Sequence, residues 1–258
     1  MSLKPITLFY SGVGPNPPKC IVSQIKIKIV ILLEELAVPY ELSLVTNKEL
    51  KEEPYTNLNP NGRSPATEDP NTGYKVWETG AIIEYLIDYY DKEQKFHYAS
   101  GPEKYQTKQW LYFQVSGQGP YFGQAACAQQ SLFLTETYDH ILSNGRTRFN
   151  IFHHEKLLSA QERYMKEVHR VVGVLDSHLF KSTSGWLVGD KITYADLAFV
   201  TWNNAIAAVF SPFPGRWDAS KYPFFQKWHE ALLARPAVQK ALTDQQKLSD
   251  KVGEPLRD

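Results

Sequence analysis

The chain has 258 residues, with 28 Lys and Arg against 28 Asp and Glu, and this length predicts one large domain or two small ones. Hydrophobic residues make up 43% and charged residues 22%, values typical of a globular protein, which exclude a disordered or fibrous chain. The formal net charge of zero argues against non-specific nucleic-acid binding, because nothing attracts phosphates over long range.

The first 95 residues predict an α/β domain. Residues 6–10 read as a strand that runs into a loop. Ile and Lys alternate over 25–31 with strand period, whereas the leucines at 32, 33 and 36 have helical spacing, which Pro39 ends. Residues 40–45 and 74–77 predict further strands, a turn-rich segment covers 59–66, and helical spacing begins at 78–80.

After Pro102 the pattern becomes helical almost to the end of the chain. Helices are predicted at about 103–130 and 154–180, from Thr193 onward, and over 224–233. Thr193 and Asp196 have the spacing of a capping box. The predicted fold class is α+β, with an α/β domain over 1–95, a short linker, and an all-helical domain over 102–245.

The environment of the chain is predicted from what the sequence lacks. Two isolated cysteines, Cys20 and Cys127, favour a reducing compartment. The N-terminal residues have no apolar stretch of a signal peptide, and no apolar run nears the roughly 18 residues of a membrane span. We therefore expect a cytoplasmic protein. No metal is expected, because adjacent histidines such as His153 and His154 point apart on a helix.

The turn at Arg63-Ser64-Pro65 is one candidate binding element. Most X–Pro bonds are trans, so the turn alone favours an ordinary turn. A cis bond would instead present the Ser64 backbone outward, where an extended ligand can pair with it like another strand.

Glu78 and Thr79 are a second candidate. A hydroxyl residue at a helix start ordinarily caps the helix. The backbone N–H groups of a first helical turn also bind anions, and the Glu78 carboxylate attracts an ammonium. A carboxylate site beside an ammonium site fits the end group of an amino acid.

The loop after the first strand is a third candidate. Ser11 and Asn16 offer a hydroxyl and an amide, donors that stabilise a thiolate and lower its pKa. Tyr10 points to the opposite face if the strand continues. It therefore ranks third and is equally well explained as a core residue.

These segments together resemble the cytosolic glutathione transferase family, and most closely its fungal branch related to the yeast nitrogen-catabolite regulator. The resemblance covers nearly the whole chain. The matching segments are Gly14-Pro15-Asn16, Leu33-Glu34-Glu35-Leu36, and residues 59–66, 77–82, 110–114, 119–124, 186–190 and 193–196.

The resemblance implies a thioredoxin-like domain that binds glutathione and a helical domain that holds a hydrophobic co-substrate, in a homodimer. It implies that Ser64, before a cis Pro65, pairs with the cysteinyl backbone and that Glu78 and Thr79 hold the γ-glutamyl end. Arg63 and Lys51 are expected near the tripeptide. Family geometry suggests a substrate pocket lined by Tyr112, Gln118, Tyr121, Phe122 and Trp202.

Three features depart from the family pattern. The family usually has Ser at Thr79 and a β-branched residue at Ser64; the hydroxyl and the backbone needed for binding are kept. The third departure is larger. Family members pass from the Gly-Pro-Asn loop directly into the first helix, whereas this chain has about nine extra residues, and Lys19 or Lys28 can each be the loop lysine.

Three functions follow from the resemblance. The first is a transferase that activates the glutathione thiol for addition to a hydrophobic electrophile. The second is a trans–cis isomerase of fungal secondary metabolism, as in the pseurotin pathway, which adds and then eliminates the thiolate. The third is a non-catalytic regulator. The yeast regulator carries an appended Asn-rich segment, and this chain starts almost at its first strand, which favours an enzyme.

Overall fold

The computed structural model describes residues 2–11, 27–125, 158–211 and 213–252. Four strands form one mixed sheet in the order β2-β1-β3-β4. They are β1 (Ile6–Ser11), β2 (Tyr40–Val45), β3 (Ala66–Glu68) and β4 (Lys75–Trp77). β1 pairs in parallel with β2 and antiparallel with β3, and β3 pairs antiparallel with β4. This sheet and its helices confirm the predicted thioredoxin-like domain.

The helix α1 (Ile27–Glu35) corrects one prediction. The Ile/Lys alternation suggested a strand, but residues 27–31 are helical and every residue from Ile27 to Leu33 is buried. Helix α1 lies between the sheet and the helical domain and contacts α3 (Thr79–Tyr90), α7 (Tyr194–Phe210) and α9 (Pro236–Val252). A helix that is covered on all sides has no polar face, so helical periodicity is missing from its sequence. The remaining short helices of this domain are η2 (Glu49–Lys51) and α2 (Tyr55–Leu58).

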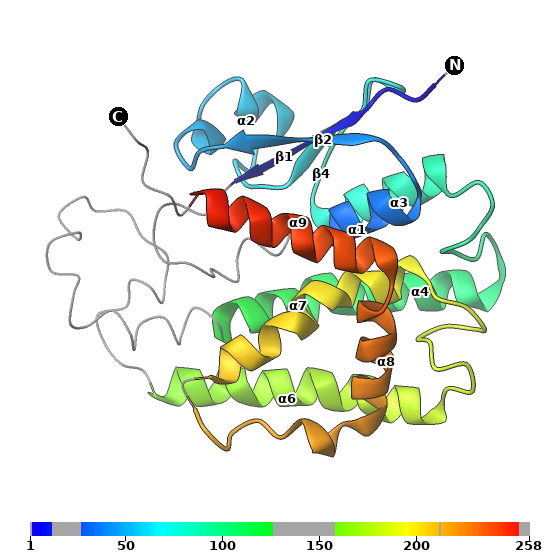
Figure 1. Cartoon of the computed structure of the whole chain (residues 1–258), viewed down its shortest axis with the longest axis vertical. Helices are drawn as coiled ribbons and strands as arrows, with labels where there is room; N and C mark the ends of the chain where they lie inside the picture. The colour runs from blue at the N-terminus through cyan, green and yellow to red at the C-terminus, as the bar shows by residue number, and fades with distance from the viewer. Residues whose placement is uncertain (1, 12–26, 126–157, 212, 253–258) are drawn as a thin grey trace, which may run out of the picture.

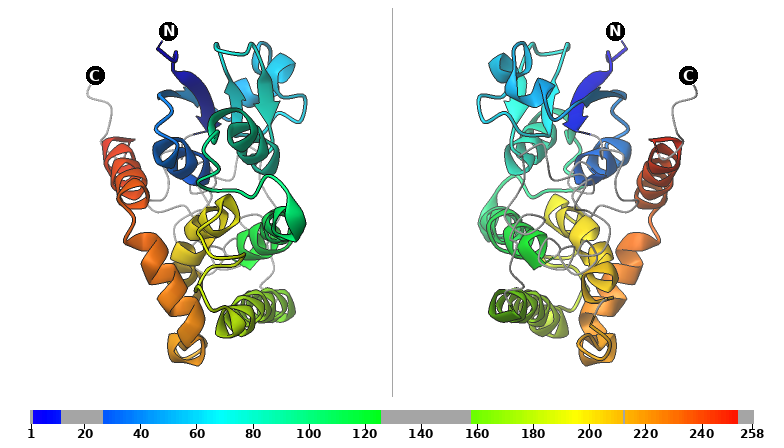
Figure 2. Two further views of the ribbon diagram at one scale, coloured as in Figure 1. Left: turned by 90° about the vertical axis from the view of Figure 1, so that its right-hand side faces the viewer. Right: turned by 90° about the vertical axis from the view of Figure 1, so that its left-hand side faces the viewer.

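The helical domain extends away from the sheet, with α6 (Leu158–Lys181) at the far end (Figures 1 and 2). α4 (Gly101–Phe113) continues into a π-helical turn, η3 (Gln114–Gln118), and then into regular helix up to Ala125. α8 (Pro223–Leu233) follows the short η5 (Ala219–Lys221). Pro236 begins α9, because a proline is accommodated at the first position of a helix.

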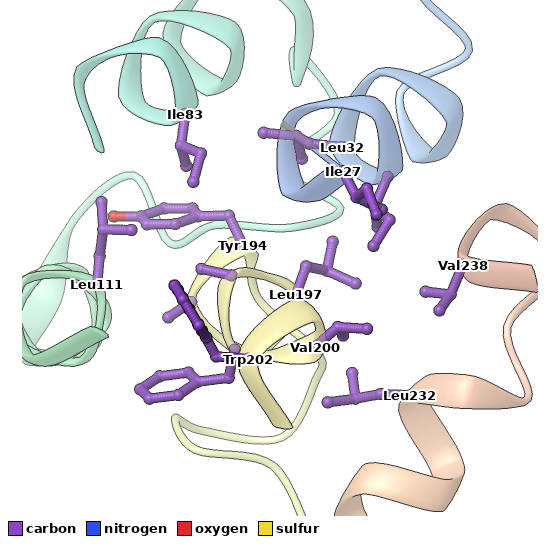
Figure 3. Close-up of a cluster of buried hydrophobic side chains, with 14 of the residues drawn as sticks. Ile27, Leu32, Ile83, Leu111, Tyr194, Leu197, Val200, Trp202, Leu232 and Val238 are labelled. Atoms are coloured by element: carbon purple, nitrogen blue, oxygen red, sulfur yellow. The ribbon is translucent and has the colours of Figure 1, made fainter. Parts of the chain in front are cut away.

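α7 lies at the centre of the helical domain, and the predicted capping box forms at its start, between Thr193 and Asp196. Figure 3 shows its apolar side chains reaching both domains. Tyr194 lies beside Ile83 of α3, and Leu197 points toward Ile27 of α1. The two domains therefore share one hydrophobic core.

Two ion pairs join α1 to α9 and to Arg235, the residue that precedes α9. Arg235 forms a two-pronged hydrogen bond with the Glu35 carboxylate, and its Nη2 lies 2.8 Å from Glu35 Oε2. Lys240 pairs with Glu34, which also accepts a hydrogen bond from the Tyr40 hydroxyl at 2.6 Å.

None of the described helices is long and apolar enough to cross a membrane.

Thr201 gives a first testable prediction, because its Oγ1 is buried in α7 and has no hydrogen-bond partner among the residues that the structure describes. Valine has the same shape and no hydroxyl to desolvate. We expect Thr201→Val to raise the free energy of unfolding by about 1 kcal/mol, measured by urea denaturation. Thr56→Val, at a partly exposed helical position, serves as the control. A destabilised T201V variant would show that the hydroxyl has a partner in solution.

Candidate functional site

Strand register brings the three predicted binding segments to one end of the sheet. Ala66 pairs with Phe9 on one side and with Trp77 on the other. Because both pairings are antiparallel, Ser64 and Pro65 lie between the end of β1 and the residues that follow β4. Ser11 thus lies on one side of the Ser64 turn, and Glu78 on the other.

The bond between Ser64 and Pro65 is cis. The resemblance implied this isomer, whereas the general frequency of X–Pro bonds favoured trans. The preceding loop is held by its own residues: the Arg63 carbonyl accepts hydrogen bonds from Tyr55 Oη and Asn59 Nδ2, both at 2.6 Å. These hydrogen bonds fix the backbone directly before Ser64. The sequence motif alone did not reveal them.

Lys51 and Arg63 both lie beside this turn. Lys51 Nζ donates to the Gly62 carbonyl at 2.5 Å, which places the ammonium one residue from Arg63. Gly62 has φ +58°, and a Cβ there would lie 2.7 Å from the Leu50 carbonyl oxygen, so only glycine fits. The two side chains are solvent-exposed and supply positive charge next to Ser64.

Glu78 adopts a backbone conformation that side chains seldom take, with φ 71° and ψ 127°. It is the N-cap residue of α3, and its side chain makes no capping hydrogen bond. Thr79 is instead the first helical residue, so the alternative in which it only caps the helix does not apply. The N–H groups of Thr79, Gly80 and Ala81 have no acceptor within the helix. Strained residues such as Glu78 concentrate at binding sites, and this one places a carboxylate beside an anion-binding helix end.

At the end of β1, Ser11 Oγ lies 2.7 Å from Ser64 Oγ. Sequence reasoning singled out both residues but missed this contact. Tyr10 points to the other face, is 8% exposed, and burial raises the pKa of its phenol. Asn16 lies outside the described residues.

The five residues predicted to line the substrate pocket differ in exposure. Tyr112 is exposed and its hydroxyl donates to Glu84 of α3 at 3.3 Å, and Tyr121 is half-buried. Gln118, Phe122 and Trp202 are buried. The last two meet edge to face, with ring centroids 6.3 Å apart.

The glycines of this segment explain the position of Trp202. A Cβ on Gly123 would lie 3.6 Å from Trp202 Cη2, and one on Gly119 would lie 3.7 Å from its Nε1. The indole therefore packs directly onto the helix backbone. A separate cavity of about 430 Å³ lies between α4 and α6, and its lining includes none of the five predicted residues.

Lys28, one of the two candidates for the loop lysine, lies buried in α1, which sequence reasoning missed. Lys28 is 3% exposed and donates to Gln114 Oε1 at 2.8 Å. Burial lowers the pKa of Lys28 to about 7. Among the described residues, no group of three His, Cys, Asp or Glu side chains is arranged to hold a metal ion.

Comparison with known proteins identifies glutathione S-transferase domains in both halves of the chain. Residues 21–88 match the model of the glutathione S-transferase N-terminal domain, and residues 135–236 match that of its C-terminal domain. The chain is 39% identical to the glutathione S-transferase-like protein tpcF of Aspergillus fumigatus, over 94% of this chain and 96% of that one.

Two solved structures from Phanerochaete chrysosporium are similar throughout. The glutathione transferase URE2P6, in complex with oxidized glutathione, is 39% identical with a TM-score of 0.75, covering 96% of this chain and 98% of that one. Ure2p5, cocrystallized with 1-(S-glutathionyl)-2,4-dinitrobenzene, is 34% identical with a TM-score of 0.72 over the full length of both. The chain therefore belongs to the glutathione S-transferase family.

Proposed function

We propose that this protein binds glutathione at the end of the sheet and activates its thiol for addition to a hydrophobic electrophile. The proposal rests on one observation: Ser64, Glu78 and Ser11 lie together at the same end of the sheet. The exposed Glu78 carboxylate complements the ammonium group of a γ-glutamyl peptide, and the N-terminus of α3 complements its carboxylate. The Ser64 backbone complements its peptide groups.

Each group has a role in this proposal. Glu78 binds the ammonium of the γ-glutamyl end, and the N–H groups of Thr79 and its neighbours bind the adjoining carboxylate. Ser64 pairs with the cysteinyl backbone, while Arg63 and Lys51 attract the glycyl carboxylate. Glutathione itself supplies the nucleophile. The protein orients it and stabilises the thiolate through hydroxyl and amide donors, Ser11 and Asn16 ahead of Tyr10.

The co-substrate and the assembly form part of the same proposal. The pocket for an apolar or aromatic molecule is assigned to Tyr112, Gln118, Tyr121, Phe122 and Trp202. Tyr112 and Tyr121 are the accessible members of this set. Exposed aromatic side chains at β4, α3 and α4 support a homodimer; they are Tyr74 and Trp77 at β4, Tyr89 of α3, and Tyr105 and Tyr112 of α4. We place the protein in the cytoplasm of a fungal cell and in secondary metabolism, because its relatives include tpcF.

Calorimetric titration with glutathione tests the site. We expect Glu78→Ala to weaken binding about 10- to 100-fold, because a charge-assisted hydrogen bond contributes about 1.5–3 kcal/mol. Glu78→Gln, which keeps the shape and removes the charge, should lose nearly as much. Glu68→Gln, on the exposed side of β3, is the control. Unchanged binding in both Glu78 variants would refute the site.

Activity separates the candidate functions. With 1-chloro-2,4-dinitrobenzene, attack of the thiolate on C1 and loss of chloride gives the conjugate that accompanies Ure2p5. Conjugate formation supports the transferase. Trans–cis conversion of a conjugated alkene with full recovery of glutathione would favour an isomerase instead. Tight binding with neither reaction would favour a regulator.

A further inference from the structure

A buried ladder of hydrogen bonds crosses from the α/β domain into the helical domain. Lys28 Nζ of α1 donates to Gln114 Oε1 at 2.8 Å, and Gln114 Nε2 donates to Gln118 Oε1 at 3.1 Å. Gln118 Nε2 then donates to Asn203 Oδ1 of α7 at 2.7 Å. None of the four side chains is more than 4% exposed. We call Lys28, Gln114, Gln118 and Asn203 the polar ladder.

Stability does not explain the polar ladder. In the part of the chain that the structure describes, Lys28 pairs with a neutral amide and with no carboxylate. It is also the second residue of α1, where the helix dipole opposes a positive charge. An apolar side chain of similar length would fill this space without desolvating an amine. What hydrogen bonds add over apolar contacts is direction, and hence a fixed position for the groups they join.

The group that the ladder positions is η3. Gln114 and Gln118 are the first and last residues of this π-helical turn, a local structure frequent at functional sites. Val115 lies between them and packs against α3, since a Cβ on Gly80 would lie 3.6 Å from Val115 Cγ1. Gly80 directly follows Thr79 in the first turn of α3. The same turn thus contacts Lys28 on one side and the anion-binding end of α3 on the other.

We propose that Lys28 is a positioning residue for glutathione binding, an inference that rests on the proposed glutathione site. Through Gln114 it holds the η3 turn against the first turn of α3 and so fixes the wall behind the γ-glutamyl end group. Without this hydrogen bond, apolar packing leaves η3 free to shift along α1. The first turn of α3 then loses its fixed contact with Val115 of η3.

Gln114→Glu provides a conservative variant. A glutamate at 114 keeps the link to Lys28 as an ion pair but no longer donates to Gln118. Within the described part of the chain the Asn203 amide nitrogen is buried without a partner, so the rest of the ladder can reverse its direction. Asn203 Nδ2 then donates to Gln118 Oε1, and Gln118 Nε2 donates to Glu at 114. The ladder again leaves one buried polar atom unpaired, Asn203 Oδ1 in place of Asn203 Nδ2.

The test is calorimetric titration of the full chain with glutathione, beside thermal denaturation. We expect Lys28→Met to weaken glutathione binding about 5- to 10-fold, the size of one lost hydrogen bond, without lowering the melting temperature. Gln114→Glu should bind within about two-fold of wild type, since the link is kept. Leu33→Met, an apolar change on the same helix outside the ladder, is the matched control.

The outcomes distinguish this inference from the proposed function. A wild-type protein that does not bind glutathione refutes both. Wild-type binding with equal affinity in K28M overturns the inference alone, as does a Q114E variant that loses as much affinity as K28M. Should K28M fail to fold, Val115→Ala carries the test. It leaves the ladder intact but removes the contact with Gly80, so its affinity must fall at least about three-fold; unchanged affinity overturns the inference.

Discussion

Replacing Lys28 by methionine is expected to make the protein more stable at neutral pH. Lowering the pKa of this lysine from 10.5 to about 7 corresponds to about 5 kcal/mol of unfavourable free energy. Removing the amine also leaves Gln114 Oε1 without its donor, which costs about 1–3 kcal/mol. We therefore expect K28M to raise the free energy of unfolding by about 2–4 kcal/mol at pH 7, measured by urea denaturation.

The pH dependence gives the sharper signature. Between pH 7 and 10.5 the unfolded chain carries a proton on Lys28 that the folded protein does not. Unfolding is therefore linked to proton uptake, and wild-type stability rises with pH across this range. Below pH 7 both states are protonated and the penalty is constant. In K28M this contribution to the slope disappears, so its advantage over wild type shrinks as the pH rises and is reversed near pH 10.5, where only the missing donor to Gln114 remains.

A matched control is Lys227→Met, the same chemical change at an exposed position of α8. Its stability should stay within about 0.5 kcal/mol of wild type. A destabilised K28M protein that keeps the wild-type slope would mean that Lys28 is charged and paired in solution. The burial assigned to it would then be wrong.

Local sequence signals predicted the parts of the fold that depend on neighbouring residues. The capping box at Thr193 and Asp196 needs only a spacing of three residues, and the structure contains it. The α/β and helical domains follow from a change of periodicity, and the family motifs placed Ser64, Glu78 and Thr79 near one another. The strand register explains why these residues lie near one another, because Ala66, two residues after Ser64, pairs with Trp77, the residue before Glu78.

Contacts between distant segments were not predictable in the same way. Ser11 and Ser64 are 53 residues apart, and nothing in either segment indicates that their hydroxyls meet. Lys28 was misread because alternating Ile and Lys indicates a strand with one wet face, whereas α1 is covered by both domains. The position of Trp202 likewise depends on Gly119 and Gly123 leaving room on another helix. Such packing becomes visible only when the elements are assembled.

Asp196→Ala is expected to be the most destabilising single change in the helical domain. The carboxylate is fully buried, and burial raises its pKa while four hydrogen bonds oppose that rise. Oδ1 accepts from Leu187 N at 3.0 Å and from Trp228 Nε1 at 2.9 Å. Oδ2 accepts from the N–H and the hydroxyl of Thr193, both at 2.8 Å. One side chain thus joins the start of α7 to α8 and to the preceding loop.

Alanine would leave these buried donors without an acceptor, each at a cost of about 1–3 kcal/mol before the structure relaxes. We expect D196A to lower the free energy of unfolding by about 3–5 kcal/mol, measured by urea denaturation with tryptophan fluorescence. Asp196→Asn should lose less stability, because the amide oxygen can still accept hydrogen bonds from Leu187 N and Trp228 Nε1. The amide NH₂ would then face the two Thr193 donors and lose only their hydrogen bonds. Asp88→Ala, at an exposed position of α3, is the control. If D196A unfolded at the same urea concentration as D88A, water would be satisfying these donors, and α7 would be held by its apolar contacts alone.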